Sequence, residues 1–587
     1  MSVPPMSSPE EGMNAGEDAW VTSTVRRVPT RGFRTAVVNG PLGSESAAPV
    51  PALGRVRIGA VRWRSRIVAP LMRPTRGLSA LLVTSLLALA PPARAAWHAL
   101  EEIPVESQVY KWVDDLASSY PLNRGLMLTR PWTRAELGEF LDQLVADQPE
   151  AARDPVVHRL RRELEPEGGL RGGLEPLGQV DEDDASLEVS PYARVGYAED
   201  RARSLVARDE RVGAQVSAAF GGYGLIFADA YVGPASPGAH GTPDASGRFD
   251  SGSTDLTAWY DRVYATWATR GFSVKAGHTW LRWGPGATGT LALSDAAPAF
   301  DLIQMTARFG KHAEFSWFVG SLDPAAETYL SGHRLDLRLG RSVEVAFSGL
   351  ARFNGAGNAA LYLIPVAPLP FMERRVRGSG SSTADSLENV RSVNVLYSGD
   401  FSWTWRPGIR LYGELMLDDI TLDHSRPLRA GWQGGAEIRR AGTPRSWTAR
   451  LDYSRVYRYT YASAEGIDFI HAGFPTGYYL GPDVDQWSGR FEWRWGAGWT
   501  WGVEGFATRK GAGALGESWQ PGTPVPNAVL TYPVDHDTRA AATAEWSPSP
   551  SWTVSGVVGQ AKVEALGNVV GNDHSGAYGS ARATLRW

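Results

Sequence analysis

The sequence predicts an all-β transmembrane barrel of about 18 antiparallel strands, preceded by a small periplasmic helical bundle. Three observations lead to this fold class. Residues 186–587 alternate apolar or aromatic side chains with polar ones over segments of about ten residues, as strands between lipid and a polar lumen do. Short turns alternate with longer loops between these segments. The 587 residues include 23 Trp, 20 Tyr and 18 Phe, which suits interfacial girdles better than a soluble sandwich.

The first 71 residues are predicted to be a disordered extension. Residues 1–71 are rich in Pro, Gly, Ser and Arg and show neither helical nor strand periodicity. Met72 stands where a signal peptide would begin. The extension is therefore interpreted as the product of a mis-assigned translation start, with a genuine disordered leader as the alternative.

Residues 72–95 have the three parts of a secretory signal peptide. Arg73 and Arg76 precede an apolar run at 78–90, and a small-residue cleavage site ending at Ala95 follows. The run is too short to cross a bilayer as a helix, so cleavage between Ala95 and Ala96 is favoured over a membrane anchor.

Residues 96–167 are predicted to form three short helices in the periplasm. Apolar residues recur at the i, i+3, i+4, i+7 spacing of an amphipathic helix, first at Val109, Trp112, Val113 and Leu116, and again at Leu137, Phe140, Leu141 and Leu144. Thr133 and Glu136 form a capping box before the second helix, and Asp154 followed by Pro155 begins a third. The Gly-rich, acidic stretch 168–185 is expected to be a linker.

Residues 186–587 are predicted to form the outer-membrane β-barrel. In 490–495, Phe491, Trp493 and Trp495 share one face of a strand, while Arg490, Glu492 and Arg494 share the other. Tight turns alternate with loops expected to run mostly from about 11 to about 40 residues, the first of them at 199–211 and another at 320–330. An even strand count places the tight turns and the helical segment in the periplasm, and the long loops outside the cell.

Three stretches of the sequence resemble the Wzi family of outer-membrane lectins associated with capsule assembly. They are IPVESQVYKWVDDL at 103–116, LTRPWTRAELGEFLDQL at 128–144 and, most specifically, GHTWLRWGPGATGTLALSDAAPAF at 277–300. The resemblance implies a periplasmic helical bundle before an 18-stranded barrel. It also implies a protein that helps to hold capsular polysaccharide at the cell surface.

Aromatic and charged residues at loop ends are the candidates for polysaccharide binding. One cluster lies where a strand leaves the barrel for a long loop, and a second lies in a later loop: Trp280, Arg282 and Trp283, then Tyr478, Tyr479, Asp483 and Asp485. Aromatic faces and Arg forks suit the C–H faces and the hydroxyls or carboxylates of sugars. For the first cluster, an interfacial girdle with a turn is favoured over a loop that folds inward and narrows the lumen. For the second, an ordinary solvated loop is favoured over a binding site.

No catalytic residue, metal site or cofactor is predicted. The absence of Cys excludes disulfides and thiolate chemistry, His278 lacks a serine nucleophile motif, and no P-loop or dinucleotide fingerprint is present. The net charge of −4 argues against a nucleic-acid partner. The expected partners are capsular or surface polysaccharide, outer-membrane lipid and, through the terminal aromatic Trp587, the barrel insertion machinery.

The preferred hypothesis is a non-enzymatic protein of the cell outer membrane that binds surface or capsular polysaccharide and helps to attach or assemble it at the cell surface. The alternative is an outer-membrane porin or polysaccharide transport channel, because about 18 strands can enclose an aqueous pore.

Overall fold

The computed structural model describes most of the chain from residue 99 onward. The described ranges are 99–120, 127–164, 178–182, 185–234, 256–355, 393–418, 426–441, 445–463, 466–495, 498–520, 529–549 and 552–586, with a few short pieces between them. All of them belong to the compact unit Thr75–Trp587; the other unit is Met1–Pro74. The predicted extension (1–71), signal peptide (72–95), Ala95–Ala96 cleavage site and terminal Trp587 lie outside the described residues. Among the described residues, no helix is long and apolar enough to span a bilayer.

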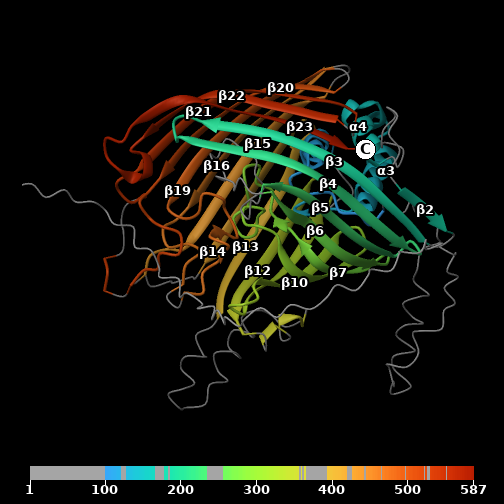
Figure 1. Ribbon diagram of the computed structural model, residues 1–587, viewed down its shortest axis with the longest axis horizontal. Helices are drawn as coiled ribbons and strands as arrows, with labels where there is room; N and C mark the ends of the chain where they lie inside the picture. The colour runs from blue at the N-terminus through green and yellow to red at the C-terminus, as the bar shows by residue number, and fades with distance from the viewer. Residues whose placement is uncertain are drawn as a thin grey trace, which may run out of the picture. The chain divides into compact units, whose positions relative to one another are not determined.

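Eighteen strands of the described chain close into an antiparallel barrel, which confirms the predicted fold class (Figure 1). They are β3 (Ala185–Asp200), β4 (Leu205–Phe220), β5 (Gly224–Pro234), β6 (Leu256–Ala268), β7 (Phe272–Thr279), β9 (Phe300–Phe309), β10 (Ala313–Asp323), β11 (Thr328–Leu339), β12 (Val343–Asn354), β13 (Val393–Arg406), β14 (Ile409–Asp418), β15 (Ala430–Arg440), β16 (Arg445–Val456), β19 (Val484–Trp495), β20 (Trp499–Lys510), β21 (Asp535–Ser549), β22 (Trp552–Glu564) and β23 (His574–Arg586). Each strand pairs with the next in sequence, and β23 closes the ring on β3. A further strand, β2 (Gly178–Glu182), pairs with the beginning of β3 inside the stretch that was expected to be a linker.

The alternation of side chains along each strand separates an outer face from a lumen. On β19, Phe491 and Trp493 are each 42% exposed, whereas Glu492 and Arg494 are buried inside the barrel. Leucines such as Leu415 and Leu451 are exposed near the middle of their strands. Exposed tryptophans gather toward the strand ends: Trp403, Trp405, Trp493, Trp495, Trp499 and Trp501 at one end, and Trp432 and Trp487 at the other. An apolar band between two aromatic girdles is the outer surface of a membrane barrel.

The two ends of the barrel differ in their connections. One end, called the turn rim here, carries tight turns such as 221–223, 269–271 and 310–312. The other end, the loop rim, carries most of the long connections. The long loops expected at 199–211 and 320–330 are wrong, because β4 begins at Leu205 and β11 at Thr328, which leaves only short turns at 201–204 and 324–327.

Inward-facing ion pairs explain the early start of β4. Asp209 on β4 faces the lumen, where it pairs with Arg211 at 2.6 Å and with Arg582 at 3.3 Å. Asp200 then accepts a hydrogen bond from the Arg203 amide and closes the turn. The polar residues of 199–211 therefore belong to a strand that pairs along its whole length with β3, and not to a solvated loop.

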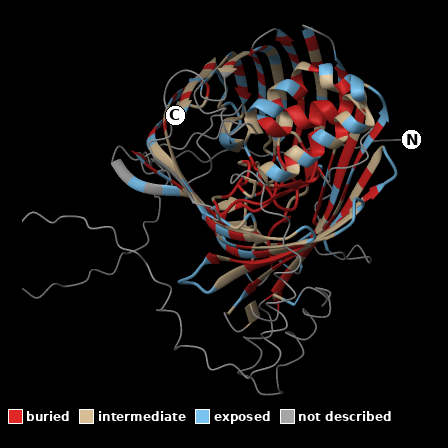
Figure 2. Ribbon diagram, turned by 90° about the vertical axis from the view of Figure 1, so that its right-hand side faces the viewer, coloured by how far each residue is buried: buried red, intermediate tan, exposed pale blue. Residues whose placement is uncertain are grey.

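Three helices precede the barrel, as the apolar spacing predicted: α2 (Gln108–Ser119), α3 (Arg134–Asp147) and α4 (Pro155–Leu164). Thr133 and Glu136 make both hydrogen bonds of the capping box at the start of α3. The apolar faces pack into one core around Val113, Leu137 and Leu160. In Figure 2 the buried sides of the helices appear as red stretches beside exposed blue ones.

Candidate functional site

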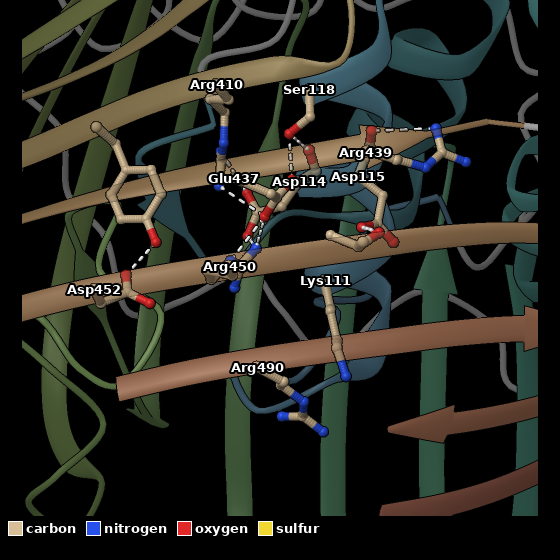
Figure 3. Close-up of polar contacts among 12 residues, drawn as sticks. Lys111, Asp114, Asp115, Ser118, Arg410, Glu437, Arg439, Arg450, Asp452 and Arg490 are labelled. Atoms are coloured by element: carbon tan, nitrogen blue, oxygen red, sulfur yellow. Dashed lines mark hydrogen bonds and ion pairs between the residues drawn. The ribbon is translucent and has the colours of Figure 1, made fainter. Parts of the chain in front are cut away.

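Helix α2 presents a row of charged side chains to the lumen at the turn rim (Figure 3). Asp114 pairs with Arg410 of β14 at 2.9 Å and Asp115 pairs with Arg494 of β19 at 2.6 Å. Lys111 pairs with Glu492. The apolar residues of α2 face the other helices, so the polar face of an amphipathic helix replaces water inside the barrel.

The protein environment shifts the pKa values of these α2 residues in different directions. Burial alone would raise the pKa of Asp114, but Arg410, Arg130 and Arg450 outweigh it and lower that pKa. Burial raises the pKa of the Asp115 carboxyl, and burial lowers the pKa of the Lys111 ammonium group. Of the two α2 carboxylates, Asp114 is thus the one that neighbouring arginines stabilise in its charged form.

Other parts of the helical segment bind the same rim of the barrel. Glu344 of β12 accepts hydrogen bonds from the amides of Met127 and Leu128, at 2.7 and 3.1 Å. Thr129 lies against Arg334, which is fully buried and pairs with Asp400 at 2.8 Å. A buried ion pair orients its partners more than it stabilises the fold. These contacts close the turn rim with the helical segment.

The segment 280–299, called the inner loop here, folds into the lumen from the opposite end. Trp283 is fully buried, with its ring edge-on to Phe318 at 5.4 Å between centroids and the guanidinium of Arg334 5.8 Å from its centre. Trp280 is also buried, and its indole N–H donates to the Ala297 carbonyl at 3.1 Å. The interfacial-girdle interpretation of these two tryptophans is therefore wrong, and the inward-folding alternative describes the structure.

Backbone contacts join the inner loop to the helical segment and to the wall. β1 (Thr129–Arg130) pairs with β8 (Arg282–Trp283), so a two-stranded sheet forms inside the barrel. The carboxylate of Glu414 on β14 accepts hydrogen bonds from the amides of Leu291 and Ala292, at 3.0 and 3.1 Å. Figure 2 shows these buried segments in red inside the ring of strands.

The second predicted cluster lies in and beside the connection 457–483, which packs on the inner loop. The hydroxyls of Tyr478 and Tyr479 both donate to the Gln486 side chain, at 3.0 and 2.7 Å. Asp483 accepts from the Gly513 amide at 2.9 Å. Asp485 pairs with Arg455 at 3.0 Å and with Arg509 at 2.6 Å. These residues are buried and hydrogen-bonded within the protein, so the favoured interpretation of a solvated loop is wrong.

A cavity of about 430 Å³ remains between the inner loop and the wall formed by β19–β23, β3 and β4. Two of the predicted residues, Arg282 and Tyr479, line it. Trp280, Trp283, Tyr478, Asp483 and Asp485 are not among its lining residues. Smaller cavities of about 230 and 190 Å³ adjoin it along α2 and share Glu106 and Gln108 with it. The structure therefore brings one residue from each predicted cluster to a common luminal space, called the luminal cavity below.

Sequence reasoning missed the wall side of this cavity. Its residues include Thr500, Glu504 and Phe506 of β20, Ser555 of β22 and Arg582 of β23. The available signal was the small size of many inward positions on these strands, as at Ser555 and Ser580. Small luminal side chains leave this half of the lumen open, whereas arginines fill the lumen along the opposite wall.

Comparison with known proteins identifies one matching family. The sequence pattern of the capsule assembly protein Wzi family matches residues 189–574. A search for similar sequences among curated proteins gives no match.

Several solved structures have a similar chain path. Wzi of Escherichia coli, described as an outer membrane protein involved in group 1 capsule assembly and as a carbohydrate-binding β-barrel, superposes with a TM-score of 0.56 at 12% sequence identity. The superposition covers 82% of this chain and 99% of the E. coli chain. OprD of Pseudomonas aeruginosa gives a TM-score of 0.37 at 11% identity, over 70% of this chain and 96% of that one. OccAB2 of Acinetobacter baumannii gives 0.38 at 9% identity, over 69% and 98% of the two chains.

Proposed function

Because the chain belongs to the capsule assembly protein Wzi family, we propose that it is a non-enzymatic outer-membrane protein that binds surface or capsular polysaccharide and helps to attach or assemble it at the cell surface. The E. coli member with the same fold is described as carbohydrate-binding. The proposal extends that property to this chain.

The single observation that carries the proposal beyond family membership is the filled lumen. The helical segment occupies the turn rim, and the inner loop and the connection 457–483 occupy the lumen above it. A porin of similar strand number keeps an aqueous channel. A barrel filled from both ends is better suited to display a binding surface than to pass solutes.

The proposal includes an orientation in the membrane. The turn rim and the helical segment face the periplasm, the long loops face the cell exterior, and the aromatic girdles contact outer-membrane lipid. Insertion by the barrel insertion machinery follows from this location. The charged face of α2 pairs with barrel residues, and these ion pairs hold the helical segment on the periplasmic side.

Only some of the residues predicted from the sequence are proposed to bind saccharide. Arg282 and Tyr479 keep a role because they line the luminal cavity. Trp280, Trp283, Tyr478, Asp483 and Asp485 are proposed to support the loops that shape this cavity, since they are buried in contacts within the protein.

Two measurements on the purified full-length protein and on a deletion strain test the proposed function. We expect the deletion strain to release its surface polysaccharide into the medium, and complementation to restore retention. We expect the wild-type protein to be silent in planar bilayers. Normal retention without the protein would contradict the binding role, and steady ohmic conduction would support the porin alternative.

A further inference from the structure

We propose that the luminal cavity binds a short stretch of uncharged, hydroxyl-rich sugar units from the polysaccharide, a proposal that rests on the proposed function and gives it a site. The cavity has about 430 Å³ of space, within the range of about 300–1,000 Å³ that is typical of small-molecule sites. It lies inside the barrel, away from the loop surfaces where the sequence placed the candidates.

Small side chains occupy several inward positions of the cavity wall. Inward positions on β22, β23 and β3 carry Ser555, Ser580 and Gly196, all of which line the cavity. On the opposite side of the lumen, the inward positions carry fully buried arginines such as Arg334 and Arg410. The luminal cavity therefore lies in the half of the barrel where many inward residues are too small to fill the lumen.

Thr500 and Arg282 each bring to the cavity a buried polar atom that has no hydrogen-bond partner within the protein. Thr500 is 7% exposed and its hydroxyl oxygen is unpaired, and Arg282 is 8% exposed and its Nε is unpaired. Both residues line the cavity. Buried polar groups usually find a partner, so these atoms indicate a ligand that offers hydroxyl groups.

The remaining lining has the chemistry of a sugar site. Glu504 and Asp295 can accept from sugar hydroxyls, and Arg490 can donate to them. Phe506 provides an aromatic face for the C–H side of a sugar ring.

The charge of the lining selects against acidic sugars. Six acidic residues line the cavity, against four basic ones: Glu106, Asp209, Asp295, Glu492, Glu504 and Glu545, against Arg208, Arg282, Arg490 and Arg582. Acidic lining residues such as Asp209 and Glu492 are already paired, with Arg211 and Lys111, and the lining carries no excess of basic residues that would bind a polyanionic segment. This is why the proposal specifies uncharged units.

The cavity extends toward the loop rim. Ala198 and Ala207, which line it, lie close to the short turn 201–204, where the described chain carries no long loop. Its other end is bounded by Glu106 and Gln108, just before and at the start of α2. The cavity therefore runs from the loop-rim half of the lumen to the helical segment.

A steric substitution tests the proposal in the full-length protein. The probes are the intact surface polysaccharide of the host cell and its partial acid hydrolysate, separated into neutral and acidic oligosaccharides of about two to six units, a length that the cavity volume limits. Binding is measured for the wild type, for Ser555→Trp, which fills the cavity, and for Val554→Trp, the matched control on the lipid face of the same strand. We expect Ser555→Trp to weaken binding of the neutral oligosaccharides at least tenfold and Val554→Trp to leave it unchanged.

Heat-modifiable gel migration reports whether each variant forms the barrel. Should Ser555→Trp fail to fold, Thr500→Val keeps the shape of the side chain and removes only the unpaired hydroxyl. We expect it to weaken binding about three- to tenfold, the range for loss of one hydrogen bond.

The outcomes separate the cavity site from the proposed function. A wild-type protein that binds neither the intact polysaccharide nor its fragments contradicts the proposed function itself. Binding of intact polysaccharide together with unchanged fragment binding in folded Ser555→Trp or Thr500→Val overturns the cavity site alone. Binding of the intact polysaccharide but of no oligosaccharide fraction, or a preference for the acidic fraction, overturns it as well.

Discussion

Trp283 is a residue at which several parts of the filled lumen meet. Its ring contacts Phe318 on β10 and lies near Arg334 on β11. Its backbone pairs with Thr129 of the helical segment and donates to the Leu293 carbonyl in the inner loop. A side chain that is fully buried in this way fills space and does not present a surface to a sugar.

Replacing Trp283 by Ala is expected to destabilise the packed lumen without a specific loss of binding. The cavity left behind should cost about 3–5 kcal/mol of unfolding free energy. Denaturant unfolding measures this cost, and surface polysaccharide normalised to folded protein should not change. Trp487→Ala, on the half-exposed outer face, is the control and should cost less. Lower retention per folded barrel in Trp283→Ala would give this residue a direct part in binding.

Charge on the lipid face should be penalised according to depth. Leu451 is exposed near the middle of β16, whereas Trp495 ends β19 at the turn rim. Leu451→Arg should cost about 2–4 kcal/mol and Trp495→Arg about 0–1 kcal/mol, because the midplane is the most apolar layer of the membrane. Unfolding of the two variants in lipid vesicles measures the difference. Equal costs would mean that the apolar band does not lie where the strand geometry puts it.

At the scale of elements, the inner loop is held in the lumen mainly by backbone hydrogen bonds to side chains of the wall. Glu414 binds the amides of Leu291 and Ala292, and Gln433 donates to the same carboxylate at 2.6 Å. Tyr461 donates to the Leu291 carbonyl at 2.6 Å from the neighbouring connection. The loop conformation therefore depends on residues more than 100 positions away in the chain.

Glu414→Ala should release the inner loop while leaving the barrel intact. Two buried amides lose their acceptor, at about 1–3 kcal/mol for each unsatisfied group. Trypsin should then cleave after Arg282, which is buried in the wild type. Leu415→Ala, a neighbouring position on the outer face, should remain resistant. Resistance of Glu414→Ala to trypsin would mean that the apolar packing of the loop suffices to hold it.

At the scale of the whole molecule, the helical segment closes the turn rim of the barrel. The lumen-facing charges of the turn rim, among them Arg410, Arg439 and Arg494, find their partners on helices and not only on neighbouring strands. If the helical segment were removed, water would solvate these charges. The barrel should therefore remain stable while its turn rim opens.

Deleting residues 96–167 should convert a silent barrel into a conducting one. We expect heat-modifiable migration to persist, and single-channel recordings to show a small ohmic conductance, because the inner loop still narrows the lumen. The matched control is the full-length protein from the same preparation. Loss of the folded barrel on deletion would show that the helical segment is part of the folding unit. Its buried ion pairs with the strands would then be needed for the barrel to fold.

The sequence by itself determined the architecture of this protein. The period of two in the strands, the helical spacing at Val109 and Leu137, and the capping box at Thr133 are local signals, and the structure has the predicted 18 strands and three helices. Local patterns suffice there because lipid, lumen and helix core each impose a repeat on neighbouring residues. The same local reasoning failed at 199–211, where a charged stretch looked like a loop although Asp209 pairs with Arg211 on its own strand and with Arg582 of β23 along the barrel wall.

Only the tertiary structure decided what the loops do. The spacing at Trp280 and Trp283 was compatible with a girdle or with an inward fold, and the choice depended on Arg334, Glu414 and Tyr461, which are distant in sequence. The luminal cavity likewise arises where two predicted clusters, at Arg282 and Tyr479, meet small residues of six strands. A pattern of neighbouring residues does not predict this cavity. The contacts that stabilise it join segments that only the closed barrel brings together.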